Sequence, residues 1–271
     1  MDSIEPICPF DASAYTGTPD AEPTGRRMNV PAMIRQLDQL INAGRAGKAQ
    51  HFLEQRRAEA AELGDWRAEL SILSEMMGQY RFGGKKEEGL AAVRDGMELV
   101  RLHHLGWTVS GATILLNAAT TLRHFGRPAE SLPIFRHVSR VYAENLDPGD
   151  YRFGGLYNNM AQSCAELEDY DGAERYYHMA LDVLARGERQ QNDMAVTWCS
   201  LAELYYKQDA EDERVDACME RAWEQLNDPA LPRDGYHALT IGKCLGCFDR
   251  FGYFVYAREL RERVAVIRGR T

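Results

Sequence analysis

The stretch LYNNMAQSCAELEDYDGAERYYHMAL, residues 156–181, predicts two amphipathic helices joined by a short turn. Apolar side chains recur at helical spacing in both halves, and the acidic pair Glu168-Asp169 between them marks the turn. Small side chains stand where the two helices must approach each other most closely, namely at Ala161, Ala173 and Ala180.

The same pattern returns along the whole chain at a spacing of about 42 residues. Counted from Ala161 in both directions, the corresponding positions are Leu37, Met77, Ala119, Ala202 and Leu245. A second close-packing position reads Ala49, Gly89, Ser131 and Ala173, is degenerate in the fifth unit, and ends with Ala257. Each occurrence is followed by a turn and a second helical pattern. The sequence therefore predicts six consecutive helix hairpins.

These hairpins resemble the tetratricopeptide repeat, whose unit is a helix hairpin with small and large residues at fixed places. The units are longer than the shortest members of that family, which have about 34 residues, by about two helical turns. This length resembles the long repeats of kinesin light chains and of bacterial regulatory proteins. The resemblance implies an all-α chain in which six antiparallel hairpins stack into a right-handed superhelical solenoid. The expected repeats are approximately 29–64, 65–106, 107–148, 149–189, 190–231 and 232–271.

Some local features depart from the repeat. Residues 1–27 lack helical periodicity, so they are expected to form an N-terminal arm that is either flexible or strapped over the exposed end of the first hairpin. The first helix is expected to begin at Asn29, a good N-cap, with Pro31 in its first turn. Pro133 does not fit a helix interior and predicts a kink or a late helix start. The fifth hairpin has an acidic insertion near Asp209–Glu213.

The chain carries a formal net charge of −9 and a pI near 5.4. Nucleic acids and anionic membrane surfaces attract clustered Lys and Arg, so this balance argues against both as partners. The sequence shows neither a secretory signal nor an apolar run of the ~20 residues that span a membrane. We therefore expect a cytoplasmic protein, and the resemblance to long bacterial repeats points to a bacterial one.

No motif predicts catalysis, because the sequence lacks a Gly-rich phosphate loop, an HExxH motif and a nucleophile elbow. Its CxxC motif, Cys244 to Cys247, lies inside an expected helix without the second pair that a zinc ribbon needs. These thiols are expected to pack in the core as small hydrophobes. His103 and His104 are adjacent and have no further ligand at metal spacing. The sequence therefore predicts no catalytic residue, no metal and no cofactor.

A candidate binding surface follows from the resemblance, since repeats of this kind bind ligands on a concave face lined by the first helix of each hairpin. Amide side chains offer both a donor and an acceptor to the backbone of an extended peptide, and cations suit acidic side chains or a terminal carboxylate. The full Lys-Asn-Asn-Lys-Arg set of the carboxylate-clamp repeats is absent, and a row of merely solvated polar residues is the alternative. The residues expected to line the groove are Arg81, Asn117, Arg123, His124, Asn158, Asn159, Gln162, Tyr206, Lys207 and Lys243.

Two functional classes remain open. The favoured one is a non-enzymatic scaffold or adaptor that binds a protein or an extended peptide in the groove. The other is a peptide-sensing bacterial regulatory protein whose solenoid changes curvature when its ligand binds. Residues 1–27 are too few for a helix-turn-helix, which weakens the second class. An RNA-binding repeat protein is disfavoured by the acidic charge.

Overall fold

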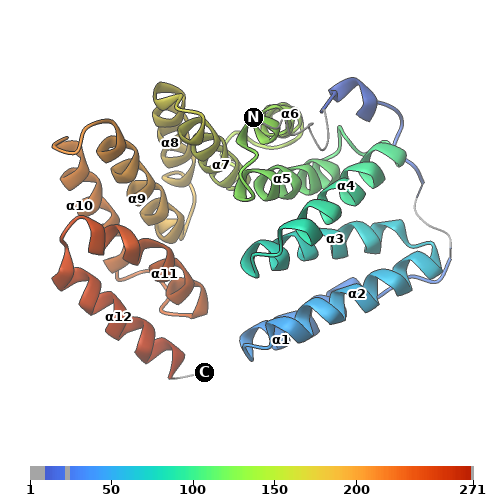
Figure 1. The fold of residues 1–271 in the computed structure, drawn as a ribbon, viewed down its shortest axis with the longest axis horizontal. Helices are drawn as coiled ribbons and strands as arrows, with labels where there is room; N and C mark the ends of the chain where they lie inside the picture. Colours follow the sequence, from blue (N-terminus) through green and yellow to red (C-terminus); the bar gives the residue numbers. More distant parts are fainter. Residues whose placement is uncertain (1–9, 22–24, 270–271) are drawn as a thin grey trace. The chain divides into compact units, whose positions relative to one another are not determined.

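The computed structural model describes residues 10–21 and 25–269. Within these ranges the chain forms α-helices and one short 3₁₀ helix, η1, and contains no β-strand (Figure 1), so the all-α prediction is confirmed. The elements are η1 (Ala12–Tyr15), α1 (Val30–Asn42), α2 (Ala46–Leu63), α3 (Trp66–Phe82), α4 (Lys86–Leu102), α5 (Val109–His124), α6 (Pro128–Asn145), α7 (Arg152–Glu166), α8 (Tyr170–Leu184), α9 (Gln191–Gln208), α10 (Arg214–Asn227), α11 (Gly235–Arg250) and α12 (Phe254–Arg268). None of the helices in these ranges is both long and apolar enough to cross a membrane.

Successive helices pair into antiparallel hairpins: α1 with α2, α3 with α4, α5 with α6, α7 with α8, α9 with α10, and α11 with α12 (Figure 1). Within a hairpin the two helices are joined by three-residue turns such as 167–169, except in the fifth hairpin, where the turn is residues 209–213. The expected insertion is therefore confirmed, and it lengthens a turn without breaking either helix.

The hairpins form two compact units, the first ending at Leu146 and the second beginning at Asp147. In the first unit, unit 1, α3 packs against α2, α4 and α5. In the second, unit 2, α9 packs in the same way against α7, α8, α10 and α11. Within each unit every hairpin therefore buries the apolar face that its neighbour leaves open.

The small residues of the repeat pattern lie in the core. Ala161, Ala173 and Ala180 are fully buried, as are Ala119 and Ala202. In the degenerate fifth hairpin, Val215 is the buried residue at the beginning of α10.

The sixth hairpin required one correction to the repeat register. Cys244 is fully buried, whereas Leu245, the residue predicted to be equivalent to Ala202, is only half-buried. The predicted register is therefore one residue late in this hairpin, because the close contact requires a small side chain and Cys244 is smaller than Leu245. A thiol fills the same buried position as a small hydrophobe.

Helix starts follow the expected chemistry. The side chain of Asn29 accepts a hydrogen bond from the backbone N–H of Ala32, and a proline stands in the first turn of α1. α6 begins at Pro128 and continues through Pro133, so the predicted late start of this helix is wrong. Pro133 is the sixth residue of α6, beyond the first turn, so its missing N–H removes one helical hydrogen bond, to the carbonyl of Ala129, while the helix continues.

The described part of the N-terminal arm lies against the second and third hairpins. η1 packs on α4, and Tyr15 is buried there. The backbone N–H of Met28 then donates to the carboxylate of Asp65, the N-cap of α3. Ile4 and Ile7, which were predicted to belong to the same arm, lie outside the described residues.

Candidate functional site

The residues predicted to line a groove all lie on the first helices of their hairpins. Arg81 is on α3, and Asn117, Arg123 and His124 are on α5, all in unit 1. The others are in unit 2: Asn158, Asn159 and Gln162 on α7, Tyr206 and Lys207 on α9, and Lys243 on α11.

In unit 1, Arg81 and Asn117 join α3 to α5. The Asn117 side-chain amide donates to the hydroxyl of Ser74 at 2.6 Å. Arg81 Nη1 donates to the hydroxyl of Thr121 at 2.6 Å and to the backbone carbonyl of Asn117 at 3.3 Å. These two side chains therefore use part of their hydrogen-bonding capacity to hold neighbouring hairpins together.

The charges around Arg81 are partly removed from water. Burial, and then the charge of Arg123, lower the pKa of the Arg81 guanidinium, while Glu75 acts in the opposite direction. Burial also raises the pKa of Glu75, with a contribution from the charge of Asp38. The two half-buried arginines and one half-buried carboxylate thus form a mixed charged surface on α3 and α5. His124 is exposed at the end of α5, where its ring contacts that of Phe125.

In unit 2, the two asparagines of α7 play different parts. Asn158 Nδ2 donates across to the hydroxyl of Thr197 on α9 at 2.9 Å. Asn159 Nδ2 donates within its own helix to the carbonyl of Gly155 at 2.8 Å. Asn158 therefore ties α7 to α9, and Asn159 remains on the surface of α7.

A recess of about 190 Å³ lies between α7 and α9. Two of the predicted residues, Gln162 and Lys207, line it. The others lining it are Ala165, Glu166, Tyr177, Ser200, Glu203 and Leu204. Of the predicted residues in unit 2, the structure thus brings Gln162 and Lys207 to one recess, with the Asn158–Thr197 hydrogen bond one helical turn away.

Lys207 is held at the edge of this recess. Its Nζ donates to the carbonyl of Ala165 in the last turn of α7, at 3.2 Å, and lies 5.2 Å from the centre of the Tyr170 ring. A cation beside the carbonyl end of a helix is stabilised by the helix dipole. The ammonium group consequently caps α7 as well as lining the recess.

Tyr206 and Lys243 lie away from the recess. Tyr206 packs edge-on against Phe251, with ring centres 5.3 Å apart, beside the turns of the fifth and sixth hairpins. Lys243 is exposed on α11. Asn117 and Asn159 each stand two residues before the buried small residue of their helix, and the residue two before Cys244 is Gly242, not Lys243.

The carboxylates Glu166 and Glu203 and the ring of Tyr177 line the recess but are not among the residues predicted to line the groove. Their helical spacing was the available signal: Gln162, Ala165 and Glu166 lie on one face of α7, and Ser200, Glu203, Leu204 and Lys207 on one face of α9. Glu203 also lies 3.6 Å from Arg250.

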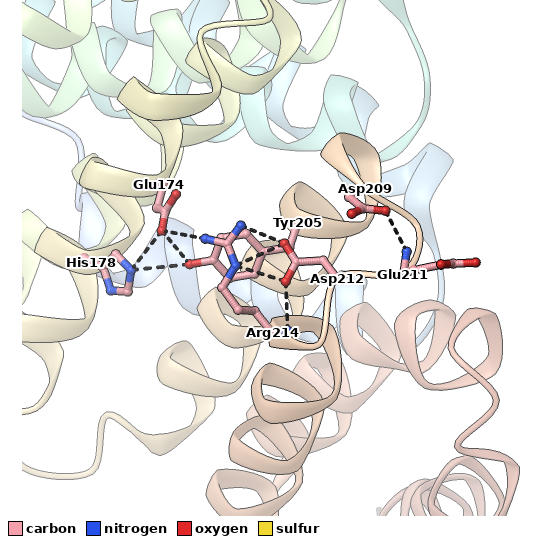
Figure 2. A network of polar contacts seen from close by, with 7 residues as sticks. All are labelled: Glu174, His178, Tyr205, Asp209, Glu211, Asp212 and Arg214. Carbon is pink, nitrogen blue, oxygen red and sulfur yellow. Dashed lines mark hydrogen bonds and ion pairs between the residues drawn. The ribbon is translucent and has the colours of Figure 1, made fainter.

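A polar network in unit 2 connects α8, α9 and the start of α10 (Figure 2). Tyr205 donates its hydroxyl to Glu174 at 2.8 Å, and the guanidinium of Arg214 stacks 3.8 Å from the centre of the Tyr205 ring. Burial, followed by the Glu174 hydrogen bond, raises the pKa of Tyr205. The phenol therefore stays protonated and acts as a hydrogen-bond donor that connects the fourth and fifth hairpins.

The cysteines of the described chain are free and buried, including Cys244 and Cys247. Among the described residues no group of three or more His, Cys, Asp or Glu side chains is arranged to hold a metal ion. The CxxC motif lies in the interior of α11, where both thiols pack in the core of unit 2.

No protein-family profile matches the chain, and no curated protein matches it by sequence. Among solved structures it is similar to BtubC (BKLC) from P. vanneervenii, with a TM-score of 0.53 and 17% identity over 90% of this chain and 92% of that one. It is also similar to a putative kinesin light chain from Podosopora anserina with nearly identical TPR-like repeats, with a TM-score of 0.51 and 13% identity over 74% of this chain and 95% of that one. These similarities confirm the predicted tetratricopeptide-like fold.

Proposed function

We propose that this chain is a non-enzymatic scaffold that binds a protein or an extended peptide on the surface of the first helices of its hairpins. A stack of tetratricopeptide-like hairpins suits a protein-interaction scaffold, because it presents one long row of helices to a ligand. Most of the polar residues that were predicted to line the groove lie on four of these first helices, α3, α5, α7 and α9.

The observation that carries the proposal is the recess between α7 and α9. Its volume of about 190 Å³ is several times the ~30 Å³ share of one water molecule, so it has room for a side chain of a ligand. The recess combines an amide, a hydroxyl and an aromatic ring, from Gln162, Ser200 and Tyr177. Such a mixture of apolar surface and a few polar groups is typical of a site that holds a ligand in one orientation.

The charges of the recess favour a peptide over a strongly charged ligand. Glu166 and Glu203 are opposed by Lys207, and both signs occur within the same small space. A peptide backbone, with its alternating N–H and C=O groups, pairs with donors and acceptors of this kind without carrying a net charge into the site. The polar groups of Gln162 and Asn159 would then face the peptide backbone, and the recess would accept a side chain.

A second function, a peptide-sensing regulatory protein, is favoured by one observation. The chain divides into two compact units between Leu146 and Asp147, directly before the Asp-Pro-Gly-Asp sequence at residues 147–150. A ligand that binds one arrangement of the units better than another would shift the population toward it.

Filling the recess tests the scaffold proposal. In the variant Ser200→Phe an aromatic ring occupies the space between α7 and α9, so a partner recovered with the wild-type protein from native cell extract should be lost. Quantitative mass spectrometry of affinity-captured proteins measures this loss. The thermal melt should be the same as that of the wild type, because Ser200 borders an existing recess.

The matched control is Asp182→Phe, which places the same ring at an exposed position of α8, a second helix. It should capture the partner as well as the wild type does. Equal recovery by Ser200→Phe and wild type would place the binding surface elsewhere. Loss of the partner in Asp182→Phe alone would assign binding to the second helices.

A further inference from the structure

The described part of the N-terminal arm, residues 10–21, is bound by histidines of the second and third hairpins. His103 Nδ1 lies 2.9 Å from a carboxylate oxygen of Asp20. His104 Nδ1 lies 3.0 Å from the backbone carbonyl of Thr16 and must donate its proton to it. The backbone N–H of Asp20 donates to the carbonyl of His103 at 3.2 Å.

The arm also fits closely onto the loop between α4 and α5. A Cβ atom at Gly17, which has a φ of +135°, would lie 2.5 Å from His104 Nδ1. A Cβ atom at Gly106 would lie 2.4 Å from Cβ of Tyr15, which is 5% exposed. Since only glycine permits these approaches, both the arm and the loop are shaped for this contact.

The third histidine, His137 on α6, is fully buried under this contact. Its Nε2 lies 2.8 Å from the carbonyl oxygen of Gly106, so Nε2 carries the proton and donates. The rings of Phe10, from the arm, and Trp107 lie against it, with centres at 5.3 Å and 4.8 Å. Its second nitrogen, Nδ1, is buried and has no hydrogen-bond partner.

Neutral His137 suits this environment, and protonated His137 does not. A proton on Nδ1 would be a buried donor without an acceptor, which is costly. Burial lowers the pKa of His137, and so does the charge of Arg140, whereas the Gly106 carbonyl and Glu144 act in the opposite direction. Arg136 and Asp11, the other charged groups here, line a recess beside Phe10 together with Arg140.

We infer that the arm is an acid-released cover: residues 10–21 stay docked on hairpins two and three while His137 is neutral, and leave them when His137 binds a proton. Undocking removes Phe10 from the imidazole and lets water reach Nδ1. A histidine whose pKa is lowered by burial stabilises the docked state fully above the ordinary histidine value of about 6.5, and this stabilisation is lost as the pH falls below it.

The pair between His103 and Asp20 opposes this release, because it gains strength when His103 is protonated. Its two side chains are 21% and 49% exposed. Water therefore weakens that attraction, whereas a proton on His137 would lie inside the closed contact, away from water. The cost of protonating His137 therefore outweighs the gain at His103, and the arm is released.

Hydrogen–deuterium exchange of the full chain tests the inference, with rates corrected for the intrinsic effect of pH on exchange. Between about pH 7.5 and about pH 5.5, the arm amides, including that of Asp20, should lose protection by up to about tenfold, the limit for one histidine at one pH unit below its ordinary pKa of about 6.5. The amides of α6 should remain protected. Unchanged protection of the arm in the wild-type protein would overturn the inference by itself.

Three variants test whether His137 is the residue that releases the arm in acid. His137→Gln keeps a donor for the Gly106 carbonyl and cannot titrate, so its arm should be equally protected at both pH values. His103→Gln should still release its arm in acid. Phe10→Ala, which changes only the arm and leaves the hairpins folded, should show weak protection and a smaller pH difference. Equal loss of protection in wild type and His137→Gln, or in wild type and Phe10→Ala, would contradict the role of His137.

Discussion

Two neighbouring glycines of α7 have opposite surroundings. A Cβ atom at Gly154 would lie 2.6 Å from Leu184 Cδ2 on α8, whereas a Cβ atom at Gly155 would meet no atom within 4 Å. We expect Gly154→Ala to lower the free energy of unfolding by roughly 1–3 kcal/mol, because it overpacks the hairpin. Gly155→Ala should raise it by up to about 1 kcal/mol through helix propensity. Urea denaturation followed by circular dichroism measures both, and equal effects would mean that α7 and α8 pack less closely here.

A second prediction at the scale of residues concerns pH. His237 is fully buried, accepts a hydrogen bond from Arg233 at 2.8 Å through Nε2, and lies 2.9 Å from the Asn192 side-chain oxygen through Nδ1. Burial, and then the charges of Arg233 and Arg263, lower the pKa of His237 to about 4. Neutral His237 therefore stabilises the folded state fully above the unfolded value of about 6.5, and this contribution is lost as the pH falls toward 4.

The loss should amount to about 2–3 kcal/mol of unfolding free energy in unit 2. Chemical denaturation of wild type and His237→Asn at several pH values measures it. The variant keeps a donor for Asn192 and does not titrate, so it should be less stable than wild type at neutral pH but lose less stability in acid. Parallel pH profiles for the two proteins would show that His237 does not titrate as described.

At the scale of elements, the long turn 209–213 depends on a side chain at the start of the next helix. Arg214 donates to both carboxylate oxygens of Asp212 and to Glu174 on α8 (Figure 2). Lysine cannot reproduce this planar, bidentate geometry. We expect Arg214→Lys to increase hydrogen–deuterium exchange in residues 209–213 without changing the rest of α10.

The control for this prediction is Arg221→Lys on the same helix. Arg221 forms an exposed ion pair with Glu224 at 3.1 Å, one turn along α10, and pairs of this kind contribute little. Exchange in the turn should be the same in this variant as in wild type. An unchanged turn in Arg214→Lys would show that backbone hydrogen bonds hold it without the guanidinium.

At the scale of the whole molecule, the fold depends on the sizes of side chains at a few positions more than on their identities. The similar solved structures share only 13–17% of their residues with this chain. Small residues such as Ala161 and Gly89 permit close helix contacts, and Cys244 serves the same purpose in the last hairpin. The net charge of −9 leaves this packing untouched and contributes to solubility.

The sequence by itself determined the helices, their pairing and most of their boundaries. These follow from periodicity within a helix, from N-caps such as Asn29 and Asp169, and from small residues that recur at a constant spacing, all of which are local in the chain.

Only the tertiary structure decided how the polar residues are used. Asn117 and Asn158 occupy similar places in the sequence pattern, yet one bonds to the preceding first helix and the other to the following one. Likewise, Lys207 caps the end of α7, and His137 becomes buried only because the loop before α5 and the N-terminal arm meet over it. Such contacts join residues about 30 to 130 positions apart. Which residues meet depends on the length of each side chain and on the register between neighbouring helices, and the periodicity within one helix carries no information about that register.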